Sequence, residues 1–300
     1  MPVQTTAAAL DLYDRGIKNR VAMYSEKQPN FWKDLGFNVK DERDLWVEKS
    51  MIGGMGIATT MREAGGVPFD SIQTPYSLKF YQDIYSIGFE LSDQAKERDL
   101  SGEIAKRSPA MARSIYWALE QSGADVINNG ATSGYTGIDG VVLFSASHPT
   151  QSTVWSNLST AATLSIDALE TMLNDLVTAP RGYRDTITPQ MGPFRLIVPG
   201  AYGMRAQRLL AGSEQPQTAN RERNVANTQI ADFSVNPYLT DTNAFTLVPM
   251  NDNPLFMLKY GDVRFRESYD ARKPVWLYTA HKEWGFGWDW PAGIQHNQGA

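Results

Sequence analysis

The chain has 300 residues, of which 42% are hydrophobic and 20% are charged, and its formal net charge is -5. This length and composition allow one large domain or two modest ones with a well-buried core, whereas the acidic balance argues against a protein that coats nucleic acid through a basic face. Cysteine is absent, which excludes disulfides, thiolate catalysis and cysteine-ligated metal sites.

The N-terminal region predicts an amphipathic helix and no targeting segment. Its first residues lack a basic stretch followed by a long apolar run, and no run of 18 apolar residues occurs anywhere, so we expect neither a secretory signal nor a membrane span. Apolar residues recur at steps of three and four from Leu10 to Tyr24, behind a cap at Thr5 or Thr6. Such a short helix is marginal alone, so it must dock on its own domain or on a neighbouring subunit.

Residues 46–90 predict a long protruding hairpin. Paired glycines at 53–54 and 65–66 interrupt a segment of β-forming residues, and Tyr85 to Leu91 alternate as in a half-buried strand. A hairpin with too little apolar content for its own core is unstable alone. We therefore expect it to lie on another surface.

The longest helical pattern follows this hairpin. Ser92 is the expected N-cap, with Asp93 in the first turn, and the Asn-Asn-Gly sequence at 128–130 is the expected end. Pro109 lies inside the pattern. Because proline removes a backbone hydrogen bond and crowds the preceding turn, we expect it to kink the helix or to divide it in two.

The second half of the chain alternates between helix and strand. Ser165 should cap a helix that ends before Pro180, residues 194–198 predict a buried strand, and residues 201–211 predict a helix. Residues 213–243 are rich in polar side chains and predict a long surface loop with little regular structure. Three or four strands should follow.

The last of these strands carries half of the eight tryptophans of the chain. Its aromatic and small residues occupy even-numbered positions, so they lie on the same side of the strand, which predicts a strand that buries one face. These residues are Trp276, Tyr278, Ala280, Trp284, Phe286, Trp288 and Trp290. A carbohydrate-stacking surface formed by Trp284, Trp288 and Trp290 is the alternative interpretation.

A cluster of Ser145, Ser147 and His148 raises the possibility of a serine hydrolase. A nucleophile needs a base in hydrogen-bond reach and an orienting acid, but triad members usually come from separate segments and no G-x-S-x-G pattern is present. Pro149 biases His148 toward an extended conformation. We therefore interpret His148 as a structural residue that is hydrogen-bonded at a strand-to-loop corner, with the hydrolase as an alternative.

Other signs of chemistry are weak. The three histidines have no metal-binding spacing, and the glycine-rich stretch at 53–60 lacks the phosphate-binding lysine pattern. We expect a structural protein that is not an enzyme, with no cofactor and no metal.

Five stretches, in their order along the chain, resemble the major capsid proteins of tailed bacteriophages, and most closely the Mu-like major head subunit group. They are YSIGFELSDQAKERDL (85–100), GADVINNG (123–130), GVVLFSASHPT (140–150), WSNLST (155–160) and NPYLTDTNAF (236–245). The resemblance runs from about Tyr85 to the end of the chain. In this family, the stretch at 140–150 corresponds to the strand and turn between two domains.

The resemblance implies the α+β Hong Kong 97-type fold. Its parts would be an N-terminal arm, an E-loop hairpin, a peripheral domain with a long spine helix, an axial domain, and strands that return to the peripheral domain. They would occupy residues 1–45, 46–90, 91–160, 161–261 and 262–300.

The implied function is self-assembly into the hexamers and pentamers of an icosahedral shell that encloses double-stranded DNA. The implied place is the virion, assembled in the cytoplasm of the bacterial host without any membrane partner. Partners would be other copies of the chain, a portal protein, DNA bound without sequence preference, and decoration and scaffolding proteins where they exist. Because the chain starts at the arm, we expect a separate scaffolding protein or none.

Four charged residues are the assembly contacts that we expect. Arg62 and Glu63 lie near the predicted hairpin tip, whereas Lys49 and Lys79 flank it. No asparagine and catalytic glutamate partner can be identified for either lysine, so we expect no covalent cross-links between subunits. An encapsulin, which uses the same fold to enclose a cargo enzyme, is the nearest alternative.

Overall fold

The computed structural model describes residues 30–55, 57–58, 60–61, 65–67, 69–98, 103–212 and 223–300. The helix expected between Leu10 and Tyr24 lies outside these residues. The helices are α2 (Phe31–Asp34), α3 (Asp93–Glu97), α4 (Glu103–Asn128), α5 (Ile166–Thr178), the 3₁₀ turn η1 (Gly200–Tyr202), α6 (Gly203–Leu210) and α7 (Ala226–Gln229). The strands are β1 (Asn38–Asp41), β2 (Trp46–Ser50), β3 (Ser77–Tyr81), β4 (Asp83–Ser92), β5 (His148–Pro149), β6 (Val154–Trp155), β7 (Phe194–Pro199), β8 (Ile230–Asn236), β9 (Phe245–Pro249), β10 (Leu255–Asp270), β11 (Val275–Trp288) and β12 (Gln295–Asn297).

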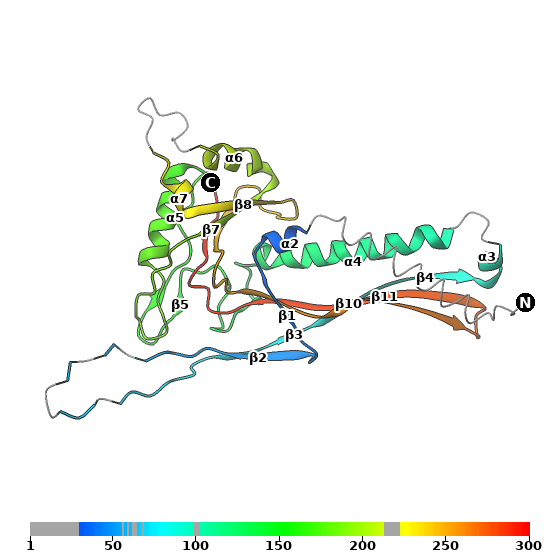
Figure 1. Ribbon diagram of the computed structural model, residues 1–300, viewed down its shortest axis with the longest axis horizontal. Helices are drawn as coiled ribbons and strands as arrows, with labels where there is room; N and C mark the ends of the chain where they lie inside the picture. Colours follow the sequence, from blue (N-terminus) through cyan, green and yellow to red (C-terminus); the bar gives the residue numbers. More distant parts are fainter. Residues whose placement is uncertain are drawn as a thin grey trace, which may run out of the picture.

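A long four-stranded sheet runs through one half of the molecule in the order β1-β10-β11-β4, and helix α4 lies along it (Figure 1). The aromatic row of β11 packs into the core beneath α4, as the sequence predicted. Trp284 is 1% exposed and stacks on Tyr85 of β4 with 3.8 Å between ring centroids. Met111, Ile115 and Leu119 of α4 are buried in the same core. This burial stabilises the long sheet.

Strand β10 contains a β-bulge near its middle. Its register with β11 shifts between Tyr260 and Arg264, and Gly261 there adopts a φ of +62°, in the left-handed region that favours glycine. Strand β1 pairs with β10 only up to Lys259. The bulge therefore lies just past the point where the edge strand β1 stops.

A second four-stranded sheet, β12-β9-β7-β8, forms a separate core with α5 and α6. Ser165 caps α5 by accepting the N–H of Ala168, and β7 covers the predicted buried strand, so both predictions are confirmed. The long loop predicted for 213–243 is wrong in part. Helix α7 and strand β8 lie within it, and β8 pairs in parallel with β7 at the edge of the sheet. The polar side chains of Ser234 and Asn236 suggested a loop, but both are buried in the folded chain.

Helix α4 runs through Pro109 without a break, so of the two predicted outcomes the division is wrong and the kink stays a prediction. The interruption comes earlier, after α3, whose N-cap Ser92 accepts the N–H of Ala95. The helix ends at Asn128, where the sequence predicted. An interior proline costs a helix about 3 kcal/mol. We attribute its tolerance to the extensive packing of α4 against the long sheet.

The short helix α2 connects the two halves of the molecule. Glu120 of α4 accepts the N–H of Trp32 at 2.8 Å, whereas Arg195 of β7 donates to the carbonyl oxygen of Asp34 at 2.8 Å. Arg195 also pairs with Asp232 of β8 at 3.0 Å. Burial is the main cause that raises the pKa of the Glu120 carboxyl to about 7.

Candidate functional site

The cluster around His148 is buried in the body of the chain. His148 is 0% exposed, its Nδ1 lies 2.7 Å from Oδ2 of the equally buried Asp139, and its ring stacks on Trp155. Its Nε2, the atom that a nucleophile would need, has no hydrogen-bond partner among the described residues. Ser145 Oγ instead accepts the N–H of Ser147. This geometry supports the structural interpretation of His148 at the start of β5 and gives no support to a hydrolase.

The segment that precedes His148 is not the strand that the resemblance implied. Residues 141–147 belong to no strand. The side chain of Asn157 instead donates to the carbonyl oxygen of Leu143 at 2.6 Å and accepts the N–H of Ser145 at 2.9 Å. A side-chain amide thus satisfies backbone groups that a neighbouring strand would otherwise satisfy. The segment is a buried joint between the two halves.

The tryptophans proposed as a sugar-binding surface are core residues. Trp284 and Trp288 are buried, and the half-buried Trp290 donates its indole N–H to the carbonyl oxygen of Arg181 at 2.9 Å. A stacking platform needs an exposed ring face. The burial of Trp284 and Trp288 therefore removes the carbohydrate alternative.

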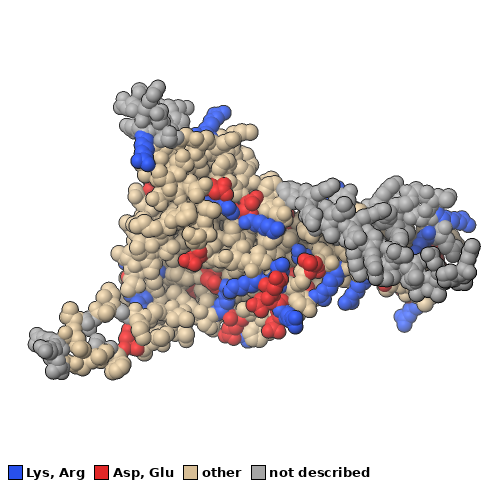
Figure 2. All heavy atoms as spheres, in the orientation of Figure 1, with Lys and Arg blue, Asp and Glu red and all other residues tan. Residues whose placement is uncertain are grey.

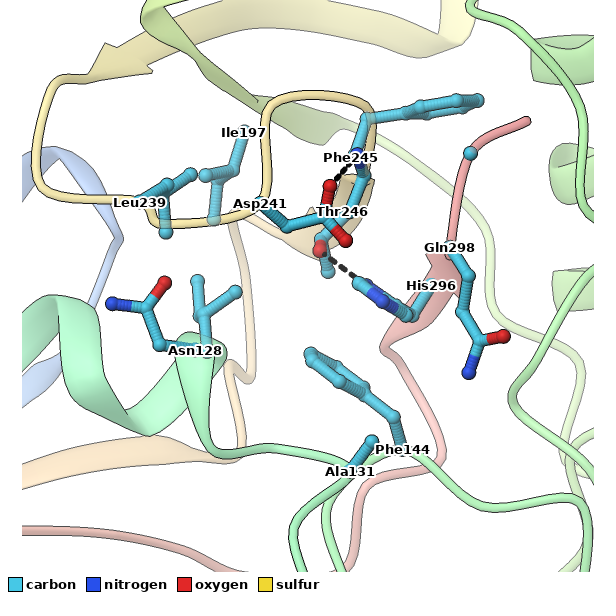
Figure 3. Close-up of a pocket in the computed structure, with 13 residues that line it drawn as sticks. Asn128, Ala131, Phe144, Ile197, Leu239, Asp241, Phe245, Thr246, His296 and Gln298 are labelled. Atoms are coloured by element: carbon cyan, nitrogen blue, oxygen red, sulfur yellow. Dashed lines mark hydrogen bonds between the residues drawn. The ribbon is translucent and has the colours of Figure 1, made fainter.

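A cavity of about 430 Å³ lies where the end of α4 meets the second sheet and the C-terminal strand (Figure 3). His296 Nδ1 lies 2.9 Å from Thr246 Oγ1, and its ring stacks on Phe144. Burial lowers the pKa of His296 to about 4, so the imidazole is neutral at pH 7. Asp241 is the sole charged residue that lines this cavity. One carboxylate and one imidazole form neither a nucleophile–base pair nor a complete metal site.

Metal and membrane sites find no support in the part of the chain that the structure describes. It contains no group of three or more metal-ligating side chains. Within the same residues, no helix combines the length and the apolar content needed to cross a membrane.

The hairpin leaves the body at β2 and returns at β3 (Figure 1), and its described residues expose a row of large apolar side chains. Among the described residues, backbone pairing continues past these strands at Met51 with Tyr76 and at Gly53 with Gln73 and at no other pair. From Ile52 outward the described arms expose large apolar side chains: Ile52, Met55, Ile57, Met61, Val67, Phe69 and Ile72. Figure 2 shows few charged atoms on this hairpin, at lower left, and mixed charges at the centre of the same face. Phe69 is 96% exposed, and an apolar row of this extent indicates an interaction surface.

Lys49 fixes the base of the hairpin to the long sheet, whereas Lys79 contacts the neighbouring strand of the hairpin. Lys49 Nζ lies 2.5 Å from Asp289 Oδ2 and 3.3 Å from the ring centroid of Phe256. Lys79 Nζ lies 4.1 Å from the ring centroid of Trp46. Both lysines are therefore engaged within the chain, and their part in subunit contacts stays a prediction. Arg62 and Glu63 lie outside the described residues.

A second anchor of the hairpin was not foreseen from the sequence. Arg184 forms a two-pronged ion pair with Asp70 on the returning arm, with Nη1 2.6 Å from Oδ2 and Nη2 3.2 Å from Oδ1. Asp70 is the sole charged residue between Glu63 and Lys79, which is a weak signal of a specific role. Nothing local in the sequence identifies its partner, because that partner lies 114 residues away.

Comparison with known proteins agrees with this geometry. The phage capsid protein family matches residues 76–288. Among solved structures, the virus-like particle from Pyrococcus furiosus is 13% identical, with 95% of this chain and 99% of that chain covered and a TM-score of 0.53. The capsid of the native GTA particle is 12% identical, with 91% of each chain covered and a TM-score of 0.57. The capsid of the cyanophage P-SCSP1u is 10% identical, with 88% of this chain and 86% of that chain covered and a TM-score of 0.57.

At these identities the solved structures show the fold alone, and no curated protein sequence matches the chain. The family match is independent of them and covers most of the sequence, including the long sheet, helix α4 and the second sheet. The α+β architecture and the resemblance of the five stretches agree with it. The chain therefore belongs to the phage capsid protein family and is a shell-forming structural protein with the Hong Kong 97-type fold.

Proposed function

We propose that this chain is the major head subunit of a tailed bacteriophage, and that it forms the hexamers and pentamers of an icosahedral shell around double-stranded DNA. The exposed apolar row of the hairpin carries this proposal. A soluble monomer rarely keeps such a row in water, whereas a neighbouring copy of the same chain would cover it. Repeated burial around closed rings would stabilise the shell.

The division into parts follows from the same proposal. The arm would occupy residues 1–45, the E-loop 46–90, the peripheral domain 91–160 with return strands at 262–300, and the axial domain 161–261. Strand β4 lies inside the E-loop range but completes the long sheet, which supports an E-loop that is rooted in the peripheral domain.

The remaining partners are proposed on chemical grounds. A net charge of -5 suits a container wall to which packaged DNA does not adhere. A portal protein would occupy one vertex, and assembly would take place in the cytoplasm of the host. The protein would act without enzymatic activity, because the one buried acid–histidine pair, Asp139 with His148, has no nucleophile beside it among the described residues.

An encapsulin shell is the second candidate. The likeness to solved structures concerns the fold alone and does not separate the two, but the phage capsid family match favours the phage head. The contents of particles from the native source separate them directly, because a phage head holds DNA and an encapsulin holds a cargo protein.

Negative-stain electron microscopy of the purified protein tests the proposal. The wild-type chain should form closed shells or hexameric and pentameric rings. The double variant Ile57→Ser with Phe69→Ser should keep the melting temperature of the subunit but lose closed shells, because it removes apolar contacts that exist only between subunits. Val154→Ser, an exposed apolar position outside the hairpin, is the matched control and should assemble. A wild-type chain that remains monomeric across salt, pH and concentration would contradict the proposal.

A further inference from the structure

The tight turn at residues 181–187 contacts two other parts of the molecule. Gly182 donates its N–H to the carbonyl oxygen of Thr186 at 2.8 Å, and Asp185 donates to the carbonyl oxygen of Gly182 at 3.1 Å. An isolated bridge between Arg181 and Ile187 closes the turn. On one side lies the β5–β6 turn at residues 150–153, and on the other lies the returning arm of the hairpin.

The contact with the β5–β6 turn is made by Asp185. This residue has a φ of +60°, a left-handed conformation that non-glycine residues rarely adopt and that the surroundings must hold in place. Its Oδ1 accepts the hydroxyls of Thr150 and Thr153, the latter at 2.6 Å. These hydrogen bonds lower the pKa of the Asp185 carboxyl, and Gln151 adds an N–H to the carbonyl oxygen of Tyr183 at 2.7 Å. The turn is therefore fixed to the body of the chain.

The contact with the hairpin is made by the two residues that precede Asp185. Arg184 holds Asp70 with two nitrogens and donates to the carbonyl oxygen of Ser71 at 2.7 Å. The Arg184 side chain is 16% exposed and that of Asp70 is 41% exposed, so water screens the pair in part and its two-pronged geometry carries the contact. The ring of Tyr183 meets that of Tyr76 edge to face, with 5.7 Å between centroids.

Both arms of the hairpin meet this turn. A Cβ atom at Gly53, on the outgoing arm, would lie only 3.0 Å from Cδ1 of Tyr183, so a glycine there allows close approach. Gly53 also pairs through its backbone with Gln73 on the returning arm. Figure 1 shows a loop below β5 that reaches down to the two arms of the hairpin.

We propose that these three segments, residues 70–71, 150–153 and 181–187, form a clasp that aims the hairpin before a neighbouring subunit binds. This inference rests on the proposed function, in which the hairpin contacts another copy of the chain. Beyond Gly53 and Gln73 the described arms have little cross-strand pairing of their own, so an unanchored hairpin would sample many directions. Fixing the direction in the free subunit lowers the ordering cost at docking, and Arg184 and Asp70 are positioning residues for assembly.

Hydrogen exchange of unassembled subunits tests the clasp directly. Arg184→Ala should make the amides of Met51, Gly53 and Ser71 exchange about tenfold faster, because the ion pair holds the returning arm on which their hydrogen-bond acceptors lie. Arg184→Lys keeps the charge but loses the two-pronged geometry and should give an intermediate effect. The exchanged pair Asp70→Arg with Arg184→Asp should restore most of the protection.

Arg195→Ala is the matched control for hydrogen exchange, because Arg195 also pairs with a half-exposed aspartate, Asp232, but contacts α2 and β8 instead of the hairpin. It should leave the exchange of Met51, Gly53 and Ser71 unchanged. In assembly assays by light scattering and microscopy, Arg184→Ala should form fewer closed shells than the wild type, and the charge exchange should recover them.

Two results would overturn the clasp: unchanged exchange at Met51, Gly53 and Ser71 in Arg184→Ala, or faster exchange with normal shell formation. A charge exchange that restores neither property would also contradict it. If wild-type subunits never assemble, the proposed function fails, whereas the exchange comparison still decides whether Arg184 fixes the hairpin.

Discussion

Two long segments without regular secondary structure have opposite surroundings in this molecule. Residues 131–147 carry glycines and apolar side chains, and Leu143 and Phe144 there are buried in the core. The described part of residues 51–76 has a similar composition, but its apolar side chains face water. The first segment finds backbone partners within the chain, chiefly through Asn157, whereas the second is anchored at its base and at Arg184. Composition alone does not decide burial; the presence of an internal partner does.

The largest loss of stability should come from breaking the buried pair that Asp139, in the first segment, forms with His148. Asp139→Ala removes the partner of His148 and an acceptor for the N–H of Val141. We expect the free energy of unfolding to fall by about 3–4 kcal/mol, because the buried imidazole of His148 and the half-buried N–H of Val141 lose their hydrogen-bond partner. Chemical denaturation of unassembled subunits measures this change. A loss below about 1 kcal/mol would mean that the joint relaxes or admits water.

We expect a smaller loss in the free energy of unfolding when Asn157 is replaced. Asn157→Ala leaves the carbonyl oxygen of Leu143 and the N–H of Ser145 without their present partner, and we expect a loss of about 2–3 kcal/mol. Phe69→Ala in the exposed hairpin is the contrasting variant, with an expected change below about 0.5 kcal/mol. Equal losses in the two variants would contradict the distinction between the two segments.

The smallest of these changes in stability is the pH dependence that the buried carboxyl of Glu120 causes. Its pKa is raised to about 7 from an ordinary 4.5, so the folded state binds the proton more tightly than the unfolded state. The cost of the buried charge is therefore fully present above pH 7 and is relieved as the pH falls from 7 towards 4.5. Glu120→Gln keeps an acceptor for Trp32 without the charge.

Relative to Glu120→Gln, the wild type should thus gain about 1–2 kcal/mol of stability between pH 8 and pH 5. Parallel denaturation series at the two pH values measure the difference. The sign of this change in stability is decisive. If the wild type instead loses stability relative to Glu120→Gln on acidification, the folded chain stabilises the carboxyl in its charged form. The hairpin variant Phe69→Ala, in contrast, should follow the wild-type pH profile.

Local signals in the sequence predicted much of the fold. The cap at Ser165, the apolar run at 194–198 and the aromatic parity of β11 each lie within one element, and each is confirmed. The resemblance identified the family before any fold was known. The boundaries of the arm, the E-loop and the two domains stay predictions.

The sequence-based predictions failed, or made no statement, where a segment depends on a partner that lies far away in the chain. Strand β8 carries Asp232, Ser234 and Asn236, which indicate a loop in the sequence, although Ser234 and Asn236 are buried in the folded chain. The ion pair between Asp70 and Arg184 joins residues 114 positions apart, so neither one predicts the other. Pairings of this kind arise only when the whole chain folds.

The bulge at Gly261 has a consequence for strand β10. In the proposed shell, subunits in pentamers and hexamers meet at different angles, so one sequence must satisfy two curvatures. The break in the ladder between Tyr260 and Arg264 allows β10 to bend and twist locally, while β11 stays paired with β4 without a register shift. We expect any change of curvature to be taken up by β10 beyond the bulge, so that the cores under β11 and α4 need not repack.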